Sequence, residues 1–243
     1  MSETIATALV TGGSSGIGGQ IRDDLLAAGY RVISLDRDPS PVTHERLITH
    51  QIDLADVNAT ERLAHAVAAE FPVTTLIHNA GVIRPSLMAD VRQEDFSYLT
   101  ALHVGTLIAI GQAVLPAMKT RRFGRIIVIS SRAVLGLRTR TSYAATKAAQ
   151  IGLVRTWALE LGEFGITVNA IAPGPVMTAQ FRANTPAGDS MEQKLAESLP
   201  VKRIGRPKDV SRVATFLAAP ESDFITGQTV YVCGGASLGA LQL

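Results

Sequence analysis

The stretch TGGSSGIG, residues Thr11–Gly18, decides the fold. It follows the aliphatic run Ile5–Val10 and leads into Ile17–Ala28, where apolar residues have helical spacing. A strand, a glycine-rich turn and a helix in this order suit a pyrophosphate, because glycines let the backbone approach the phosphates and the helix N-terminus supplies N–H donors. The spacing is G-x-x-x-G-x-G rather than G-x-G-x-x-G. A tight turn that needs positive φ is therefore the alternative interpretation.

Outward from this motif, β-branched runs alternate with longer Ala- and Leu-rich segments. The short runs are almost continuously apolar, as expected for strands covered on both faces. The alternation predicts a parallel sheet with right-handed crossovers, in one α/β, doubly wound domain over residues 1–243. The predicted strands are Ile5–Val10, Arg31–Leu35, Leu47–Ile52, Thr74–Ile77, Arg125–Ile129, Ile166–Ala170 and Thr229–Val232. The predicted helices are Ile17–Ala28, Ala55–Glu70, Gln93–Thr120, Ser142–Glu163 and Pro207–Ala219.

Composition narrows the class of protein. The 243 residues carry 23 Lys and Arg against 21 Asp and Glu, a net charge of +2, which argues against a strongly basic nucleic-acid module. The 47% hydrophobic content supports a folded core, and the single cysteine excludes a disulfide framework and favours a reducing compartment. No apolar run reaches the roughly 18 residues of a membrane span, and we interpret the N-terminal run as a strand rather than a signal peptide.

One long stretch, Pro173–Gly205, interrupts the alternation, and its pattern predicts irregular structure. Loops of this length in compact domains often cover a binding site, so we expect a substrate lid over residues 173–205. A surface excursion without function is the alternative.

Acidic residues follow two of the predicted strands. Asp36 lies eighteen residues after Gly18, where a carboxylate can hold both hydroxyls of an adenosine ribose and repel a 2′-phosphate. Arg37 follows it and can contact adenine or such a phosphate. Asp53 can meet the adenine amino group, or it can cap the helix from Ala55.

A tyrosine and a lysine share one helix face. Tyr143 and Lys147 are four residues apart, so both side chains project from the same side. Ser130 and Ser131 end the apolar run before them, and the carboxyl ends of parallel strands form the ligand crevice. The sequence therefore predicts that a serine, Tyr143 and Lys147 meet in that crevice.

Together these motifs resemble short-chain dehydrogenases/reductases of the compact single-domain kind, almost from end to end. The resemblance is carried by Thr11–Gly18, Asp36, Asp53, Asn79-Ala80-Gly81, Ser131, Tyr143, Lys147, Pro173–Thr178 and Ile225–Gln228. It implies a Rossmann-type parallel sheet of about seven strands and a nicotinamide cofactor. It also implies a homotetramer built partly on the helices after Gln93 and Ser142.

The resemblance also implies roles. Tyr143 acts as the acid/base, with a pKa lowered by Lys147 and by the positive nicotinamide. Ser131 hydrogen-bonds the substrate oxygen, although Ser130 fits the usual spacing to Tyr143 better. The implied cofactor-binding residues are Gly12, Ser14, Ser15, Gly16, Ile17, Gly18, Asp36, Arg37, Asp53, Leu54, Asn79, Ala80, Gly81, Tyr143, Lys147, Pro173, Gly174, Val176 and Thr178.

Two positions depart from the family pattern. His103 stands where the family usually has the asparagine that kinks a helix and holds a proton-relay water. Histidine can also hold a water and titrates near neutrality, so His103 is either a fourth catalytic residue or a core histidine. Cys233 stands where an aspartate is common, and we interpret it as a small packed side chain. The remaining histidines show no metal-binding spacing, so no metal site is predicted.

Arginines gather around the predicted substrate side. Arg84 follows the Asn79 turn, Arg132 follows Ser131, and Arg138 and Arg140 precede Tyr143. As a group they can hold a substrate carboxylate or phosphate. Surface or subunit-interface charge is the alternative for each. Arg182 and Phe181, in the expected lid, can also take part.

These observations predict an NAD-dependent oxidoreductase that interconverts an alcohol and a ketone or aldehyde. An NADPH-dependent 3-oxoacyl-thioester reductase is the enzyme alternative. Asp36 disfavours it, as does Ser15, where NADP-preferring relatives often carry a basic residue. A non-catalytic nucleotide-binding regulatory protein is the alternative of another class. We expect a cytoplasmic protein with no nucleic-acid or membrane partner.

Overall fold

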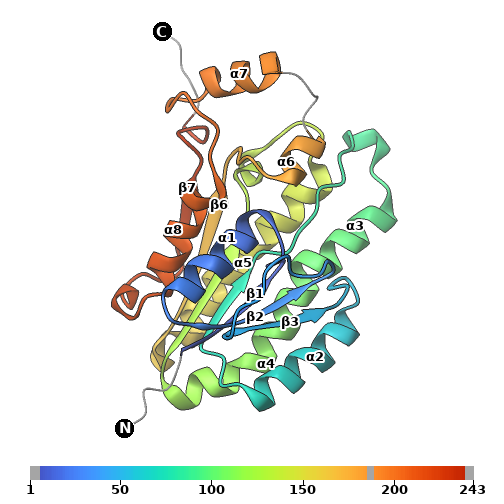
Figure 1. The fold of residues 1–243 in the computed structure, drawn as a ribbon. Coiled ribbons are helices and arrows are strands. Elements are labelled where there is room, and N and C mark those ends of the chain that lie inside the picture. The colour runs from blue at the N-terminus through green and yellow to red at the C-terminus, as the bar shows by residue number, and fades with distance from the viewer. Residues whose placement is uncertain (1–5, 185–188, 239–243) are drawn as a thin grey trace.

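A seven-stranded parallel sheet forms the centre of the molecule (Figure 1). The computed structural model describes residues 6–184 and 189–238. The strand order is β3-β2-β1-β4-β5-β6-β7, and every neighbouring pair is parallel. The strands are β1 Thr7–Thr11, β2 Arg31–Asp36, β3 Leu47–Gln51, β4 Thr75–His78, β5 Gly124–Ile129, β6 Ile166–Pro173 and β7 Thr229–Val232. The predicted doubly wound α/β fold is confirmed.

Helices cover both faces of this sheet (Figure 1). One apolar cluster joins the sheet to α1 and α8, and the other joins it to α2, α4 and α5. The α-helices are α1 Gly16–Ala27, α2 Val57–Glu70, α3 Gln93–Thr100, α4 Thr106–Arg121, α5 Thr141–Leu161, α6 Ala179–Asn184, α7 Asp189–Ser198 and α8 Pro207–Ala218.

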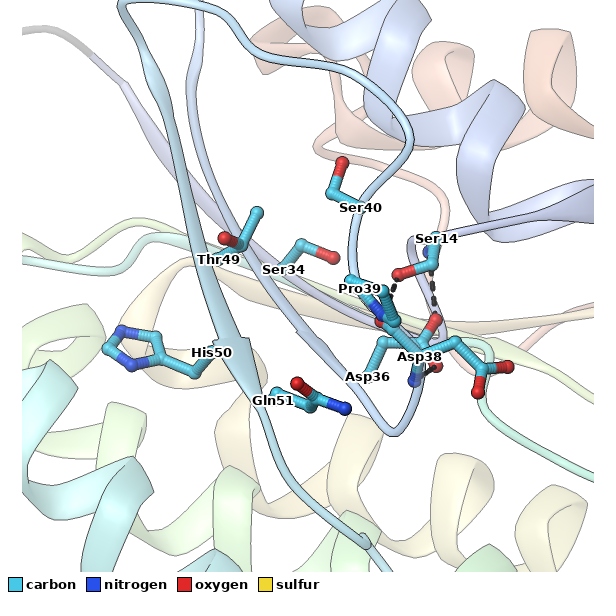
Figure 2. A pocket seen from close by; sticks show the side chains of 9 residues that line it. All are labelled: Ser14, Ser34, Asp36, Asp38, Pro39, Ser40, Thr49, His50 and Gln51. Atoms are coloured by element: carbon cyan, nitrogen blue, oxygen red, sulfur yellow. Dashed lines mark hydrogen bonds between the residues drawn. The ribbon is translucent and has the colours of Figure 1, made fainter.

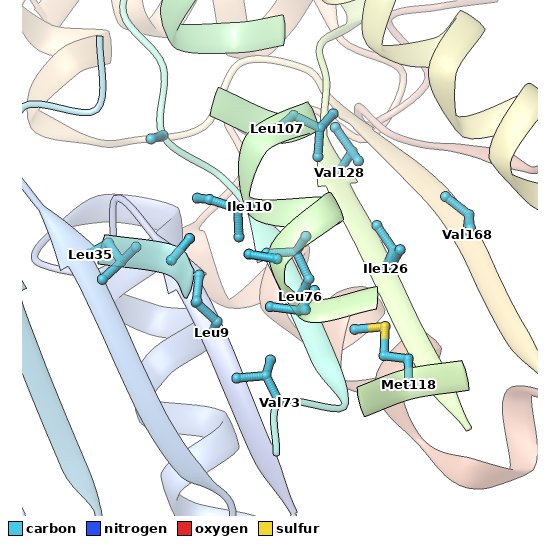
Figure 3. Packing of buried hydrophobic residues seen from close by; sticks show 14 of the residues in the cluster. Leu9, Leu35, Val73, Leu76, Leu107, Ile110, Met118, Ile126, Val128 and Val168 are labelled. Carbon is cyan, nitrogen blue, oxygen red and sulfur yellow. The ribbon is translucent and has the colours of Figure 1, made fainter. Parts of the chain in front are cut away.

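Side-chain alternation along the strands builds the two cores. Leu9 of β1 packs with Leu76 and Ile126 in the cluster of α2, α4 and α5 (Figure 3). Ala8 and Val10 of the same strand belong to the other cluster. A strand places successive side chains on opposite faces, so a strand buried on both faces must be apolar throughout.

The direction of strand order reverses between β1 and β4. The chain leaving β1 enters α1 on one face, and the segment after β4 leads to α3 and α4 on the other. Such a reversal leaves a crevice at the carboxyl ends of the strands. Thr11, Asp36, His78 and Ile129 end β1, β2, β4 and β5, so the predicted site residues gather at this edge.

Two of the differences between the observed and predicted helices have a clear local cause or consequence, and the other helix ends differ by at most two residues. The helix expected from Ala55 begins at Val57, because Asp56 is its N-cap and accepts a hydrogen bond from the Ala59 N–H. The helix expected over residues 93–120 is interrupted by a π-helical turn, Ala101–Gly105, that separates α3 from α4. Turns of this kind often mark functional sites.

The helical run from α3 to α4 also bears on the membrane prediction. Residues Gln93–Arg121 form one candidate span by length and composition, although their apolar residues are interrupted by polar ones. Of its most apolar window, 56% is buried inside the protein. A core helix of a soluble protein passes the same test.

The segment expected to be irregular contains two helices, so that part of the prediction was wrong. α6 and α7 lie between Pro173 and Gly205, and α7 projects from one end of the molecule in Figure 1. Alanine and long polar side chains favour helix formation here, although the segment has few apolar residues from which a helical pattern could be predicted. The lid function of this segment stays a prediction.

Arg125 is a buried charged residue whose substitution should destabilise the fold. Its guanidinium is buried and donates to the carbonyls of Gly124, Gly165, Ala219 and Pro220. In Arg125→Met these buried acceptors lose their donor, so we expect the free energy of unfolding to fall by about 3 kcal/mol or more. Urea unfolding measures this, with exposed Arg212→Met as the control. Equal midpoints for the two variants would contradict the assignment.

Candidate active site

The glycine loop is shaped by contact with the turn after β4. Gly12 has φ +67°, and a Cβ there would lie 2.9 Å from Asn79 Nδ2. The Asn79 amide donates to the carbonyls of Thr11 and Gly12. The Thr11 hydroxyl accepts the N–H groups of Asn79 and Ala80, both at 3.0 Å. A side chain at position 12 would therefore separate the two loops.

The N-terminus of α1 is suited to an anion. Ser15 is its N-cap, is exposed, and makes no side-chain capping bond. The first turn carries no acidic residue, and the first N–H groups of any helix lack partners within it. Gly18 has no room for a Cβ because the Gly12 carbonyl and the Asn79 amide lie against it. The loop therefore fits a phosphate group bound close to its backbone.

Asp36 is held at the end of β2 by the glycine loop. One carboxylate oxygen accepts the Ser14 N–H at 2.8 Å, and the other accepts the Asp38 N–H at 3.1 Å. The Ser14 hydroxyl donates to the Asp38 carbonyl at 2.7 Å. These side chains line a pocket of about 220 Å³ (Figure 2). Arg37 is exposed and pairs with Asp38 at 3.7 Å.

Asp53 and Leu54 lie after β3. Asp53 is exposed, and its Oδ1 accepts the Ala55 N–H at 3.0 Å, which makes a local turn. It therefore does not cap α2, whose cap is Asp56. Leu54 is buried, and its carbonyl accepts the Thr106 hydroxyl from the start of α4.

The structure brings Ser131, Tyr143 and Lys147 together. Tyr143 and Lys147 lie on α5, and Lys147 Nζ is 5.8 Å from the Tyr143 ring centroid. The Ser131 side chain hydrogen-bonds to Tyr143. The Ser130 hydroxyl is buried and instead donates to the Lys147 carbonyl at 2.9 Å. Ser131, rather than Ser130, thus faces the tyrosine.

The electrostatics around Tyr143 differ from expectation. Burial raises the pKa of Tyr143, and the Ser131 hydrogen bond and the nearby Arg140 charge only partly oppose it. Burial also lowers the pKa of Lys147 to about 7, and its Nζ donates to the Ile129 carbonyl at 2.7 Å. The expected lowering of the Tyr143 pKa therefore does not occur in the chain alone.

His103 lies in the π-helical turn with both ring nitrogens engaged. Its Nε2 accepts the Val82 N–H at 3.3 Å, so Nδ1 carries the proton toward Thr146 Oγ1 at 2.8 Å. Its ring meets Tyr143 edge-on at 5.7 Å between centroids. Burial, with the charges of Lys147 and His78, lowers the pKa of His103 to about 2. These contacts are those of a core histidine, and the relay role stays a prediction.

Gly81 packs against this histidine. A Cβ on Gly81 would lie 2.9 Å from His103 Nε2 and 3.3 Å from Lys147 Nζ. The turn after β4 therefore touches both the π-helical turn and α5.

The residues after β6 form the other wall of the crevice. Pro173 ends β6, and a Cβ on Gly174 would lie 2.7 Å from Cys233 Cα. Val176 bridges to Gly205, while Thr178 Oγ1 accepts the Phe181 N–H at the start of α6. Gly16 of the glycine loop faces Thr178.

Cys233 is buried, as predicted for a packed side chain. Burial raises the pKa of its thiol, but hydrogen bonds from Ser237 and from the backbone of residues 235–237 outweigh this and leave it below the ordinary value.

The structure engages the predicted arginines separately. Arg84 pairs with Asp95 at 3.6 Å and lies over the Tyr98 ring. Arg132 donates to the Ala236 carbonyl and lines a cavity of about 240 Å³ beside α7. Arg138 is exposed, and Arg182 contacts Met177 Sδ. Arg140 is the arginine whose charge acts on Tyr143.

Sequence reasoning missed three polar residues near the site. Arg22 is buried under the glycine loop, the Thr11 hydroxyl orders the turn after β4, and Thr146 holds His103. Thr146 was detectable, because it precedes Lys147 on α5. A lone arginine in an amphipathic helix gives no such signal. Within residues 6–184 and 189–238, no cluster of three or more His, Cys, Asp or Glu side chains could hold a metal.

The buried histidines predict acid sensitivity. Burial and the Lys147 charge lower the pKa of His78 to about 3, and the pKa of His103 is about 2. Below pH 6.5 the unfolded chain binds protons that the folded chain does not, so stability falls with pH. We expect about 2 kcal/mol lost per histidine between pH 7.5 and 5.

Urea unfolding of His103→Asn and His78→Asn at both pH values measures this loss. Each variant should lose about half of the pH dependence that the two buried histidines contribute, and exposed His65→Asn is the control. A pH dependence unchanged in both buried variants would show that these imidazoles titrate normally.

Comparison with known proteins agrees with this geometry. The family model described as "Enoyl-(Acyl carrier protein) reductase" matches residues 12–237. The chain is 32% identical over 233 residues to the 3-oxoacyl-[acyl-carrier-protein] reductase FabG of Rickettsia bellii, which covers 94% of this chain and 95% of that relative. It is also 32% identical over 247 residues to the (2S)-[(R)-hydroxy(phenyl)methyl]succinyl-CoA dehydrogenase subunit BbsD of Thauera aromatica, covering 96% and 97%. A solved structure described as "ElxO with NADP Bound" has a TM-score of 0.89 at 27% identity, covering 97% of this chain and 99% of that chain. The chain therefore belongs to the short-chain dehydrogenase/reductase family, whose members are oxidoreductases that act on CH–OH groups with NAD or NADP.

Proposed function

We propose that this chain is an NAD-dependent dehydrogenase/reductase that interconverts an alcohol and a ketone or aldehyde, with Tyr143 as acid/base. The observation that carries the proposal is the meeting of Ser131, Tyr143 and Lys147 beside the glycine loop's crevice. Tyr143 is the acid/base, Lys147 is the cation beside it, and Ser131 is a hydrogen-bond donor to the substrate oxygen. Proton transfer at a hydroxyl requires these three kinds of group.

The residues around the crevice fit a dinucleotide. The N-terminus of α1 would hold the pyrophosphate, Asp36 the adenosine ribose, and Lys147 the nicotinamide ribose. Pro173, Gly174, Val176 and Thr178 would border the nicotinamide. When bound, the nicotinamide supplies hydride-transfer chemistry.

The protein groups then move one proton. Tyr143 Oη takes the hydroxyl proton of an alcohol during oxidation and returns it to the carbonyl oxygen during reduction. Ser131 donates a hydrogen bond to that oxygen and stabilises its developing charge. An ammonium at Lys147 favours the phenolate of Tyr143, against the burial that otherwise raises its pKa.

Preference for NAD over NADP rests on Asp36. Its carboxylate is fixed by two N–H donors, and it would accept the hydroxyls of an adenosine ribose and repel a 2′-phosphate there. Arg37 is the adjacent cation, but it pairs with Asp38. The NADP bound in the ElxO structure belongs to that protein, and NADP is the competing possibility here.

A second candidate function is reduction of 3-oxoacyl thioesters. The FabG relative, at 32% identity, favours it, while Asp36 and Ser15 disfavour its usual NADPH. An anionic small alcohol is favoured instead by the position of Arg140 near Tyr143. Rates with a 3-oxoacyl thioester, and with matched alcohols that carry or lack a carboxylate, separate these substrate classes. A non-catalytic regulatory role would give no turnover with any of them.

The assembly and location follow the same reasoning. We propose a cytoplasmic homotetramer that uses α5 as one contact. Leu159 on this helix is 87% exposed, and large apolar residues left at a surface often mark interfaces. Sedimentation at working concentration tests the assembly, and a monomer would contradict it.

Substitutions of Tyr143 and of the two serines test the mechanism. Tyr143→Phe removes the proton carrier, so kcat should fall by about 10³-fold or more while NADH binding is retained. Ser131→Ala should lower kcat by about 10²-fold through loss of the oxygen's donor. Ser130→Ala should mainly lower stability, because the Lys147 carbonyl loses the Ser130 hydroxyl as a donor beside its bond within α5. Full turnover in Tyr143→Phe would exclude this mechanism, and a larger kcat loss in Ser130→Ala than in Ser131→Ala would reverse the serine assignment.

Cofactor preference tests Asp36. The wild-type kcat/KM should be higher with NAD than with NADP, and Asp36→Ala should shift the ratio toward NADP by about tenfold or more, because it removes both the ribose acceptor and the repulsion. Asp53→Ala, a change at an exposed carboxylate after β3 that does not line the Asp36 pocket, is the control and should leave the ratio nearly unchanged. A wild type that prefers NADP would refute the proposed cofactor.

A further inference from the structure

An arginine is buried beneath the glycine loop. Arg22 lies in the second turn of α1 and is 3% exposed, on the same helix as the core residues Ile21 and Leu25. Placing a guanidinium in such a position costs free energy unless its charge and donors are satisfied. Its partners therefore indicate what the charge is kept for.

The guanidinium holds two loops at once. Its Nη1 donates to the Gly13 carbonyl at 2.7 Å and reaches the Ser40 hydroxyl at 3.5 Å. Its Nε and Nη2 both meet Asp23 Oδ1 at 2.9 Å. The Asp23 side chain is about half exposed (49%), so it only partly neutralises the arginine. Arg22 thus ties the glycine loop to the segment after β2.

Gly13 is fixed from a second side as well. A Cβ on Gly13 would collide with Ser34 Oγ, a buried hydroxyl that has no hydrogen-bond partner among the described residues. Ser34 and Ser40 line the same pocket as Asp36 and Ser14 (Figure 2). A shift of Gly13 would move Ser14, the next residue, whose N–H orients the Asp36 carboxylate.

Charge supports the same conclusion. The Thr11–Gly18 loop contains no lysine or arginine. Within the loop, an anion would therefore be attracted by the first backbone N–H groups of α1. Arg22 adds a positive charge directly behind the loop, hydrogen-bonded to its backbone and largely shielded from water, where an electrostatic effect is stronger than at the surface.

We infer that Arg22 is a cofactor-positioning residue, which holds the glycine loop and the Asp36 carboxylate in place for the adenosine diphosphate half of a dinucleotide without contacting the substrate. The inference rests on the proposed function, because it presumes that this loop binds a dinucleotide. It predicts an effect on cofactor affinity rather than on proton transfer at Tyr143.

Three variants test it. Arg22→Met keeps much of the bulk but removes the charge and the donors, and Arg22→Lys keeps the charge but loses the fork of donors. Leu25→Ala, at a core residue of the same helix that belongs to the apolar cluster of α1 and α8, is the control for lost stability. Fluorescence titration with NADH and calorimetry with ADP-ribose give the affinities, and thermal unfolding gives the stability.

We expect Arg22→Met to raise the Kd of both NADH and ADP-ribose by about tenfold or more, with KM for NAD raised and kcat at saturating NAD within about twofold. Arg22→Lys should fall between Arg22→Met and wild type. Leu25→Ala should lower Tm with both Kd values nearly unchanged. Equal effects on NADH and ADP-ribose place the defect in the adenosine diphosphate half.

Wild-type affinities in folded Arg22→Met would overturn the inference, as would a Kd change matched by Leu25→Ala. If Arg22→Met does not fold, Arg22→Lys decides: a Kd raised by at least about threefold supports the inference, and an unchanged Kd overturns it. A wild type that binds neither NADH nor NADPH would instead refute the proposed function.

Discussion

The close approach of Gly12 to Asn79 and Ala80 is the contact on which the rest of the site depends. It joins the loops after β1 and β4, the neighbouring strands at which the sheet order reverses. The Asn79 amide bonds to two carbonyls of the first loop, and the Thr11 hydroxyl accepts two N–H groups of the second. Because the two loops hold each other, the N-terminus of α1 and the turn after β4 keep fixed positions relative to each other. The crevice between them is therefore bordered by loops that the protein's own hydrogen bonds hold together.

Buried cations recur around this framework, and each bonds to backbone carbonyls. Lys147 donates to the Ile129 carbonyl, Arg22 to the Gly13 carbonyl, and Arg125 to four backbone carbonyls. A carbonyl satisfies a donor without neutralising its charge. The pKa of Lys147 accordingly falls to about 7 through burial, while an arginine keeps its charge under almost any condition. The fold thus places Lys147, a cation that can titrate near neutrality, beside Tyr143. It places the permanently charged Arg22 and Arg125 where they hold backbone carbonyls.

Local patterns predicted what depends on near neighbours in the chain. The strand and helix alternation, the glycine loop and the shared helix face of Tyr143 and Lys147 all follow from spacing within a few residues. The start of α2 was missed because Asp53 and Asp56 are both plausible caps, and only the backbone turn between them selects Asp56. The helices after β6 were missed because few apolar residues mark this polar segment.

The sequence by itself determined the fold class and the family resemblance, because these rest on short-range periodicity and on motif spacing. Tertiary structure decided which serine faces Tyr143, since the Ser130 hydroxyl donates its hydrogen bond to the Lys147 carbonyl instead. It also decided that His103 has both nitrogens occupied and that Arg22 reaches back to Gly13. Hydrogen-bond partners and desolvation are set by segments far apart in the chain or by helix orientation. A residue's spacing along the chain does not contain that information.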